Sequence, residues 1–221
     1  MIRIKIIVAV VAMMSILAFG ATCALAAAWK VGGVALVGSA SIEEPVKPIG
    51  GRPILTLEVP MVPPEDTLKM TCGKLSIVGG EIVAPNKNPA QFYHFEECAA
   101  TSPVGCRLAS TSILTRELTG TTVTGAGTAA IMSLEPKVLT GGKRVLMEFV
   151  NRVPCLIRPC QIRSIVEGEF NFSMPTGQVE NLIQPLEIVS ANTLTTDGMF
   201  ETIYTFEGRV ELSNGEAFSF K

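Results

Sequence analysis

Acid–base catalysis is the first chemistry to test, because the 221-residue chain holds only one histidine. His94 lies in the run Tyr-His-Phe-Glu-Glu at residues 93–97. A Ser-His-acid triad built on it would need Asp66, Asp197 or a glutamate as its acid, and the chain has no Gly-x-Ser-x-Gly motif. A strand histidine among aromatic residues is more often a half-buried structural residue. The sequence therefore predicts no catalytic role for His94.

Paired carboxylates are the second chemistry, since two facing glutamates can hydrolyse a glycosidic bond without a histidine. Glu167 and Glu169 are two residues apart and would share one face of a strand. Sugar clefts are usually lined by tryptophan and tyrosine, and this chain has one Trp and two Tyr. The pattern favours solvent-facing positions, so we predict no catalytic residue. The candidate carboxylates are Glu96, Glu97, Glu167, Glu169, Glu201, Glu207 and Glu211.

Metal and cofactor sites find no support in the sequence. Calcium needs clustered acidic and amide oxygens, and Asp66 and Asp197 are isolated. The stretch Gly125-Ala-Gly127 lacks the spacing and the following helix of a phosphate-binding loop. One histidine and no Cys-x-x-Cys motif do not fit the usual zinc sites. We predict no cofactor and no metal.

The cysteines that follow the N-terminal segment are candidates for disulfide bonds. They are Cys72, Cys98, Cys106, Cys155 and Cys160. An odd number leaves at least one thiol unpaired or bonded to another chain. Cys155 and Cys160 are close enough in sequence to pair where the chain turns, Cys98 can pair with Cys106, and Cys72 with either of those two. The spacing leaves the pairing open.

The first residues have the three parts of a secretory signal peptide. Arg3 and Lys5 are followed by an apolar run over residues 6–19 and then by an alanine-rich segment with the small-x-small pattern of a cleavage site. The sequence predicts a signal peptide over residues 1–26, cleavage near Ala26 or Ala28, and a secreted, extracytoplasmic protein. An uncleaved membrane anchor is the alternative, because the uncharged run is long enough to span a bilayer.

The charge of the chain bears on its partners. Removal of the signal peptide leaves 16 basic residues against 20 acidic ones and moves the net charge from −2 to −4. A mildly acidic exported protein lacks the basic surface that would attract nucleic acids and anionic lipids. We therefore expect no nucleic-acid partner and no stable membrane partner after cleavage. A cell-wall or cell-surface component remains as a partner.

The elements that must position these residues are β-strands. Thr-rich and Gly-punctuated runs, with turns at Asp197-Gly198 and Asn214-Gly215, predict an all-β fold: an antiparallel β-sandwich or partly open barrel of about ten strands. The stretch 72–106 is predicted as a hairpin with its turn near residues 86–88, which would place Ser76 opposite Cys98. Phe92 and His94 would share one face of its second strand, and Tyr93 and Phe95 the other.

The domain organisation follows from the distribution of proline and glycine. We predict an N-terminal signal helix over residues 1–26, then a hairpin and a Pro/Gly-rich arm over 27–66. A single all-β domain follows over 67–221. Prolines at 45, 48, 53, 60, 63 and 64 interrupt the arm, and within it only residues 54–59 are predicted to form a strand, at the edge of a sheet.

A set of short motifs carries a resemblance to known proteins. They are Ala-Ala-Trp-Lys-Val-Gly-Gly at 27–33, Thr-Cys-Gly-Lys-Leu at 71–75, Gly-Gly-Glu-Ile at 79–82, Pro-Asn-Lys at 85–87, Phe-Glu-Glu-Cys at 95–98, Ser-Leu-Glu-Pro at 133–136 and Val-Glu-Leu-Ser-Asn-Gly-Glu-Ala-Phe at 210–218. In these motifs the chain resembles a group of exported proteins of unknown function that occur as many paralogues in high-GC soil bacteria. The resemblance implies export and a β-rich fold, and it brings no activity, substrate or catalytic residue.

Three functions follow from the sequence. The favoured one is a secreted or cell-surface, non-catalytic β-sandwich protein with a structural or binding role. The second is an exported hydrolase that acts on glycans with carboxylates alone. The third is an envelope-anchored stalk held by an uncleaved N-terminus.

Overall fold

The structure is a computed structural model that describes residues 27–60, 67–102, 104–153, 160–188, 194–198 and 200–221. These residues form strands and turns and contain no helix, which confirms the all-β prediction. Accordingly, none of them belongs to a helix that is long and apolar enough to cross a membrane. The predicted signal helix, the cleavage residue Ala26 and Cys155 lie outside the described residues, and so does the side chain of Cys160.

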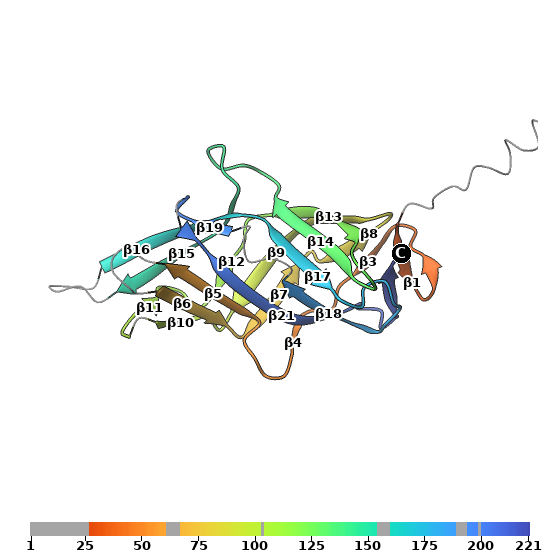
Figure 1. The fold of residues 1–221 in the computed structure, drawn as a ribbon, viewed down its shortest axis with the longest axis horizontal. Helices are drawn as coiled ribbons and strands as arrows, with labels where there is room; N and C mark the ends of the chain where they lie inside the picture. The colour runs from red at the N-terminus through yellow and green to blue at the C-terminus, as the bar shows by residue number, and fades with distance from the viewer. Residues whose placement is uncertain (1–26, 61–66, 103, 154–159, 189–193, 199) are drawn as a thin grey trace, which may run out of the picture.

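Most of the molecule is one antiparallel sheet of 14 strands that curls into a half-barrel (Figure 1). Its path runs β10 (Ala99–Ser102), β6 (Thr67–Cys72), β5 (Leu55–Pro60), β21 (Ile203–Glu211), β18 (Ile183–Ile188), β17 (Phe170–Met174), β14 (Ala130–Pro136), β13 (Leu118–Thr124), β9 (Lys87–Glu96), β8 (Glu81–Val83) and β3 (Ser39–Ser41). Three strands pair beside this path: β7 (Lys74–Val78) and β12 (Ile113–Leu114) on β9, and β4 (Lys47–Pro48) on β21.

A five-stranded sheet extends one end of the half-barrel (Figure 1). Its order is β11 (Arg107–Leu108), β15 (Val145–Val153), β16 (Cys160–Gly168), β19 (Leu194–Thr196) and β20 (Phe200–Glu201). Gly168 has a φ of 128°, a backbone conformation that residues other than glycine rarely adopt. The chain changes direction there and continues as β17 in the large sheet.

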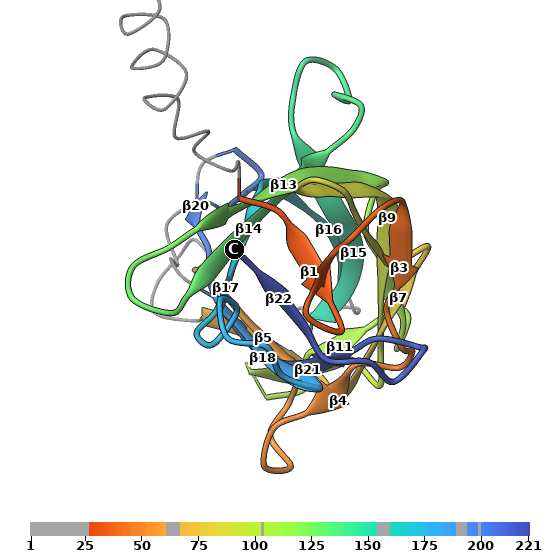
Figure 2. The same ribbon diagram turned by 90° about the vertical axis from the view of Figure 1, so that its right-hand side faces the viewer.

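A three-stranded sheet lies across the opposite end of the half-barrel (Figure 2). It contains β2 (Val34–Ala35), β1 (Trp29–Val31) and β22 (Phe218–Phe220). Trp29 is buried and its ring packs edge-on against Phe220 with centroids 5.1 Å apart. The amide of Ala28 donates to the carbonyl of Lys221 over 2.6 Å, and the amide of Lys221 donates back over 3.0 Å. The two ends of the described chain therefore lie side by side.

Alternation along the strands directs apolar side chains into the curled sheet. The predicted faces of β9 are confirmed, because Tyr93 and Phe95 are buried while Phe92 and His94 are half-buried. Tyr93 stacks on Phe172 at a centroid distance of 5.9 Å, and further aromatic rings continue this cluster. Burial raises the pKa of the Tyr93 hydroxyl, which keeps it neutral.

The predicted register of the hairpin over 72–106 is wrong. Ser76 lies opposite His94 rather than Cys98, and the chain reverses between Val83 and Lys87. The turn was predicted near residues 86–88 because Asn86, Asn88 and Pro89 have turn propensity. Asn88 is instead buried in β9, where its side-chain amide donates to the Thr122 hydroxyl over 3.0 Å. A tertiary hydrogen bond therefore satisfies a residue that local rules assign to a turn.

The segment predicted as an edge strand is an inner strand. β5 lies between β6 and β21 and pairs with both along its length. Its prolines stand outside or at the last position of the strand, so inner residues keep their amide donors. Leu55, Leu57 and Val59 alternate into the core. The described part of residues 27–66 thus supplies β1 to β5 to the sheets.

Candidate functional site

Two rows of polar side chains cross the outer face of β9, β13, β14 and β17. In the first row Thr121 lies directly opposite Lys87 on one side and Ser133 on the other. Ser133 in turn lies opposite Asn171. Directly opposed residues on paired strands point to the same face. Four strands spaced by about 4.8 Å give this row a length of about 14 Å.

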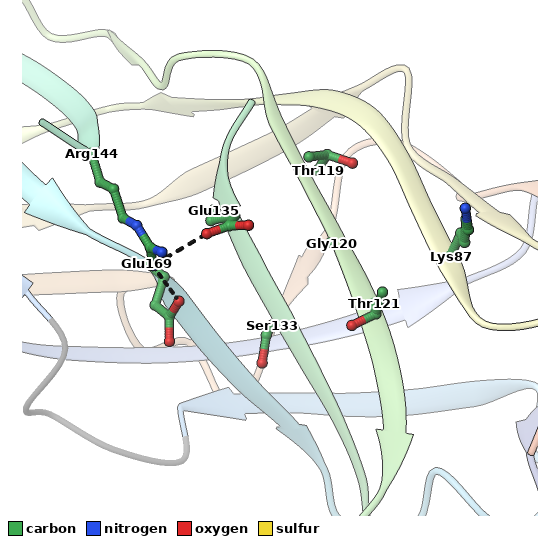
Figure 3. A pocket seen from close by; sticks show the side chains of 8 residues that line it. All are labelled: Lys87, Thr119, Gly120, Thr121, Ser133, Glu135, Arg144 and Glu169. Carbon is green, nitrogen blue, oxygen red and sulfur yellow. Dashed lines mark hydrogen bonds and ion pairs between the residues drawn. The ribbon is translucent and has the colours of Figure 1, made fainter. Parts of the chain in front are cut away.

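The second row contains the acidic groups and Arg144 (Figure 3). Thr119 lies opposite Glu135 on the paired strands β13 and β14. Arg144 reaches over from the start of β15 and contacts the carboxylates of Glu135 at 3.2 Å and Glu169 at 3.1 Å. One guanidinium therefore holds the Glu135 carboxylate on β14 and the Glu169 carboxylate in the break between β16 and β17.

Hydrogen bonds connect the two rows into one network. The Ser133 hydroxyl donates to the side-chain oxygen of Asn171 over 2.7 Å. The Asn171 amide donates to Glu169 over 3.1 Å, and Glu169 also accepts from Arg144. The side chains of this network are thus oriented by one another, which lowers the entropic cost of any binding that uses them.

Together the rows line a surface depression of about 360 Å³ (Figure 3). Gly120 lies at its base, where the pairing of β13 with β9 shifts register in a bulge. A Cβ at this glycine would lie 1.8 Å from the backbone oxygen of Ser133, so only glycine permits this approach of β13 to β14. The depression is lined by Lys87, Thr119, Gly120, Thr121, Ser133, Glu135, Arg144 and Glu169.

His94 meets a serine on the outer face of the sheet. Its Nε2 atom lies 2.5 Å from the hydroxyl of Ser112, which stands immediately before β12. A serine beside a histidine is the first contact of a nucleophile–base pair. Among the described residues, no carboxylate hydrogen-bonds to His94 to orient its ring, and the pair does not line the depression on β13 and β14. The contact is therefore an exposed hydrogen bond between two polar residues.

Most of the glutamates considered for hydrolysis face a basic residue. Glu97 contacts Lys74 at 2.6 Å, and this hydrogen bond raises the pKa of the lysine. The remaining ion pairs are Glu167 with Lys143, Glu169 with Arg144, Glu207 with Arg52 and Glu211 with Lys47. Glu96 is half-buried and Glu201 exposed. Glu96 and Glu97 both act on the Lys74 ammonium, and neither of the two described depressions contains more than one of these seven carboxylates.

One glutamate that the sequence did not single out carries the densest ion pairing. Glu148 on β15 accepts a hydrogen bond from Arg116 over 3.0 Å and a second, shorter one from Arg163. The bond from Arg163 lowers the pKa of Glu148, and Arg116 adds to the effect. A general acid in glycoside hydrolysis needs a raised pKa. The group therefore serves to tie β15 to its neighbours.

The cysteines of the predicted hairpin pair across it. The structure joins Cys72 to Cys98 across a sequence separation of 26 residues, and both are buried. The corrected register explains this pairing, because it continues from Lys74 opposite Glu96 to Cys72 opposite Cys98. Cys106 is a buried free thiol, and burial raises its pKa. A raised pKa reduces the thiolate fraction and makes this thiol unreactive.

A second depression of about 370 Å³ lies beside β3 and β8. Glu43, Glu44 and Glu81 line it together with serine and glycine residues, and none of its lining residues is basic. Within the described ranges no three His, Cys, Asp or Glu side chains lie close enough to hold a metal ion. The mixed-charge depression on β13 and β14 is therefore the better candidate for binding.

Sequence reasoning missed most of this site. Only Glu169 appeared among the candidates, and its arginine partner was not considered. A usable signal was present: Thr119 and Thr121 are two residues apart, as are Ser133 and Glu135, which is the spacing of side chains on one face of a strand. Their meeting depends on the register of β13 with β14, which the sequence does not specify. No family model matches the chain, and comparison with curated proteins and with solved structures finds no similar protein.

Proposed function

We propose that this chain is an exported, non-catalytic β-protein that binds a component of the cell wall or cell surface. The observation that carries the proposal is the connected polar network in the depression on β13 and β14. The Cys72–Cys98 bond supports export, because disulfides persist in oxidising compartments. The pairing of glutamates with lysines and arginines argues against the hydrolase, since it holds the carboxylates as structural anions.

The export part of the proposal predicts where processing occurs. Ala27 packs against the core and Ala28 pairs with Lys221 through two hydrogen bonds. Cleavage after Ala26 keeps both contacts, whereas cleavage after Ala28 removes them. We therefore expect N-terminal sequencing of the exported protein to begin at Ala27. A retained segment 1–26 on the exported protein would favour the envelope-anchored stalk instead.

The binding part of the proposal is tested with purified cell-wall glycans. The folded protein is sedimented with each insoluble glycan fraction, and the supernatant is assayed for new reducing ends. We expect retention on at least one fraction without release of reducing ends. New reducing ends would identify the carboxylate-dependent hydrolase. Failure to sediment with any fraction would reject the binding role.

A further inference from the structure

One end of the depression on β13 and β14 carries a cation without a described acidic partner. Lys87 lies in β9 opposite Thr121, and its ammonium makes no ion pair within the described part of the chain. Five other lysines do pair with a glutamate: Lys47, Lys69, Lys74, Lys137 and Lys143. A free ammonium in a polar depression is available for a charge-assisted hydrogen bond to an anion.

The middle of the depression offers hydroxyl groups. The Thr121 hydroxyl makes no hydrogen bond to any described residue, so its donor and both acceptor sites are open. The Ser133 hydroxyl donates to Asn171 and keeps its acceptor sites. Groups that both donate and accept match the hydroxyls of a sugar ring, which do the same.

The far end of the depression accepts hydrogen bonds. The Glu135 carboxylate, held by Arg144, presents oxygens to a ligand that brings donors, while the neighbouring Glu169 carboxylate already accepts from Arg144 and Asn171. Two carboxylates at this end repel a second anionic group, so a ligand has its charge at the Lys87 end. No aromatic residue lines the depression, and the ligand is therefore held by its hydroxyl edge rather than by stacking.

We propose that this depression binds a saccharide unit that carries one carboxylate. The Lys87 ammonium takes the carboxylate, Thr121 and Ser133 contact ring hydroxyls, and Glu135 accepts from a further hydroxyl. The inference rests on the proposed binding function and names the class of its ligand. A free sugar acid and one unit of an acidic glycan share this chemistry.

Calorimetric titration of the full mature chain with three probes tests the proposal. The probes are galacturonic acid, trigalacturonic acid and galactose. We expect trigalacturonic acid to bind and galactose, which lacks the carboxylate, to bind at least about tenfold more weakly. Affinity for the acidic probe falls as salt rises, because the Lys87 contact is exposed to screening. If galacturonic acid and the trimer bind with equal affinity, the natural ligand is a free sugar acid. If the trimer binds about tenfold more tightly or more, the natural ligand is a glycan chain.

Two variants locate the site. Lys87→Gln and Thr121→Val each remove one contact, and we expect each to weaken binding of the acidic probe by about tenfold. Their matched controls are Lys69→Gln on β6 and Thr205→Val on β21, which make the same changes outside the depression. The controls should bind as the unaltered chain does. Thermal denaturation verifies that all four variants fold.

Specific outcomes would overturn the inference. Absence of binding to both acidic probes, or equal binding of galactose, rejects the ligand class. Equal affinity of Lys87→Gln and the unaltered chain rejects the site. If both site variants still sediment with the cell-wall glycans as the unaltered chain does, the proposed binding function is retained and only its assignment to this depression is rejected. If the unaltered chain does not sediment with them either, the proposed function itself fails.

Discussion

The inner and outer faces of β13, β14 and β17 carry opposite chemistry on adjacent residues. Leu134 and Phe172 are fully buried on the inner face, one residue away from Ser133 and Asn171 on the outer one. The inner side chains pack against an aromatic cluster, while the outer ones form a hydrogen-bonded polar network. Because side chains alternate along a strand, the same three strands build both the core and the candidate site. Stability and binding should therefore respond to different substitutions.

The largest loss of stability is expected from Phe172→Ala, on the inner face. The ring packs against Phe206 at a centroid distance of 4.9 Å and against Tyr93 at 5.9 Å, and it is fully buried. Its removal leaves a cavity in the core, which we expect to lower the free energy of unfolding by about 3–5 kcal/mol. Thermal denaturation should show a melting temperature lower by roughly 6–20 °C.

The matched control is Ser173→Ala, one residue along the same strand. Ser173 lies opposite Ile131 on the outer face and is half-buried. Removal of its hydroxyl should change the free energy of unfolding by no more than about 0.5 kcal/mol. Comparable losses in the two variants would show that the faces are not separated as the structure indicates.

The local part of this arrangement was predictable, and the long-range part was not. Alternation assigned Tyr93 and Phe95 to the buried face correctly, because burial of one face imposes a period of two. The turn at Asp197-Gly198 also agrees, with φ of 54° and 68°. Asn88 was misplaced because its partner Thr122 is 34 residues away. Arg144 was missed for the same reason, since the two carboxylates that it holds lie on β14 and between β16 and β17.

An intermediate effect is expected from the Cys72–Cys98 bond. The bond ties the end of β6 to Cys98, which lies between β9 and β10, and closes a loop of 26 residues. Such a crosslink restricts the unfolded chain, and we expect its loss in the double variant Cys72→Ala/Cys98→Ala to cost about 2–4 kcal/mol. Chemical denaturation in urea measures the change.

Loss of the Cys72–Cys98 bond should lower stability without weakening binding. Neither cysteine lines the depression, so the variant is expected to bind the acidic probe normally at a temperature where it is folded. Reduction of the unaltered chain should reproduce the loss of stability. An unchanged denaturation midpoint after full reduction would mean that the bond contributes nothing to the free energy of unfolding.

The smallest effect is expected at Glu148, on β15 of the five-stranded sheet. The hydrogen bond from Arg163, supported by Arg116, lowers the pKa of this carboxyl below its ordinary value of 4.5. The folded state therefore favours the ionised form, and the resulting stability is fully present above pH 4.5 and is lost as the pH falls through the lower folded pKa.

Because the pair is partly exposed, Glu148→Gln should cost less than about 1 kcal/mol at neutral pH. The difference from the unaltered chain should shrink on acidification, as followed by urea denaturation at stepped pH. A loss of stability that stays constant with pH would assign the effect to packing rather than to charge. A loss near that of Phe172→Ala would show that this ion pair stabilises the fold as much as the buried ring does.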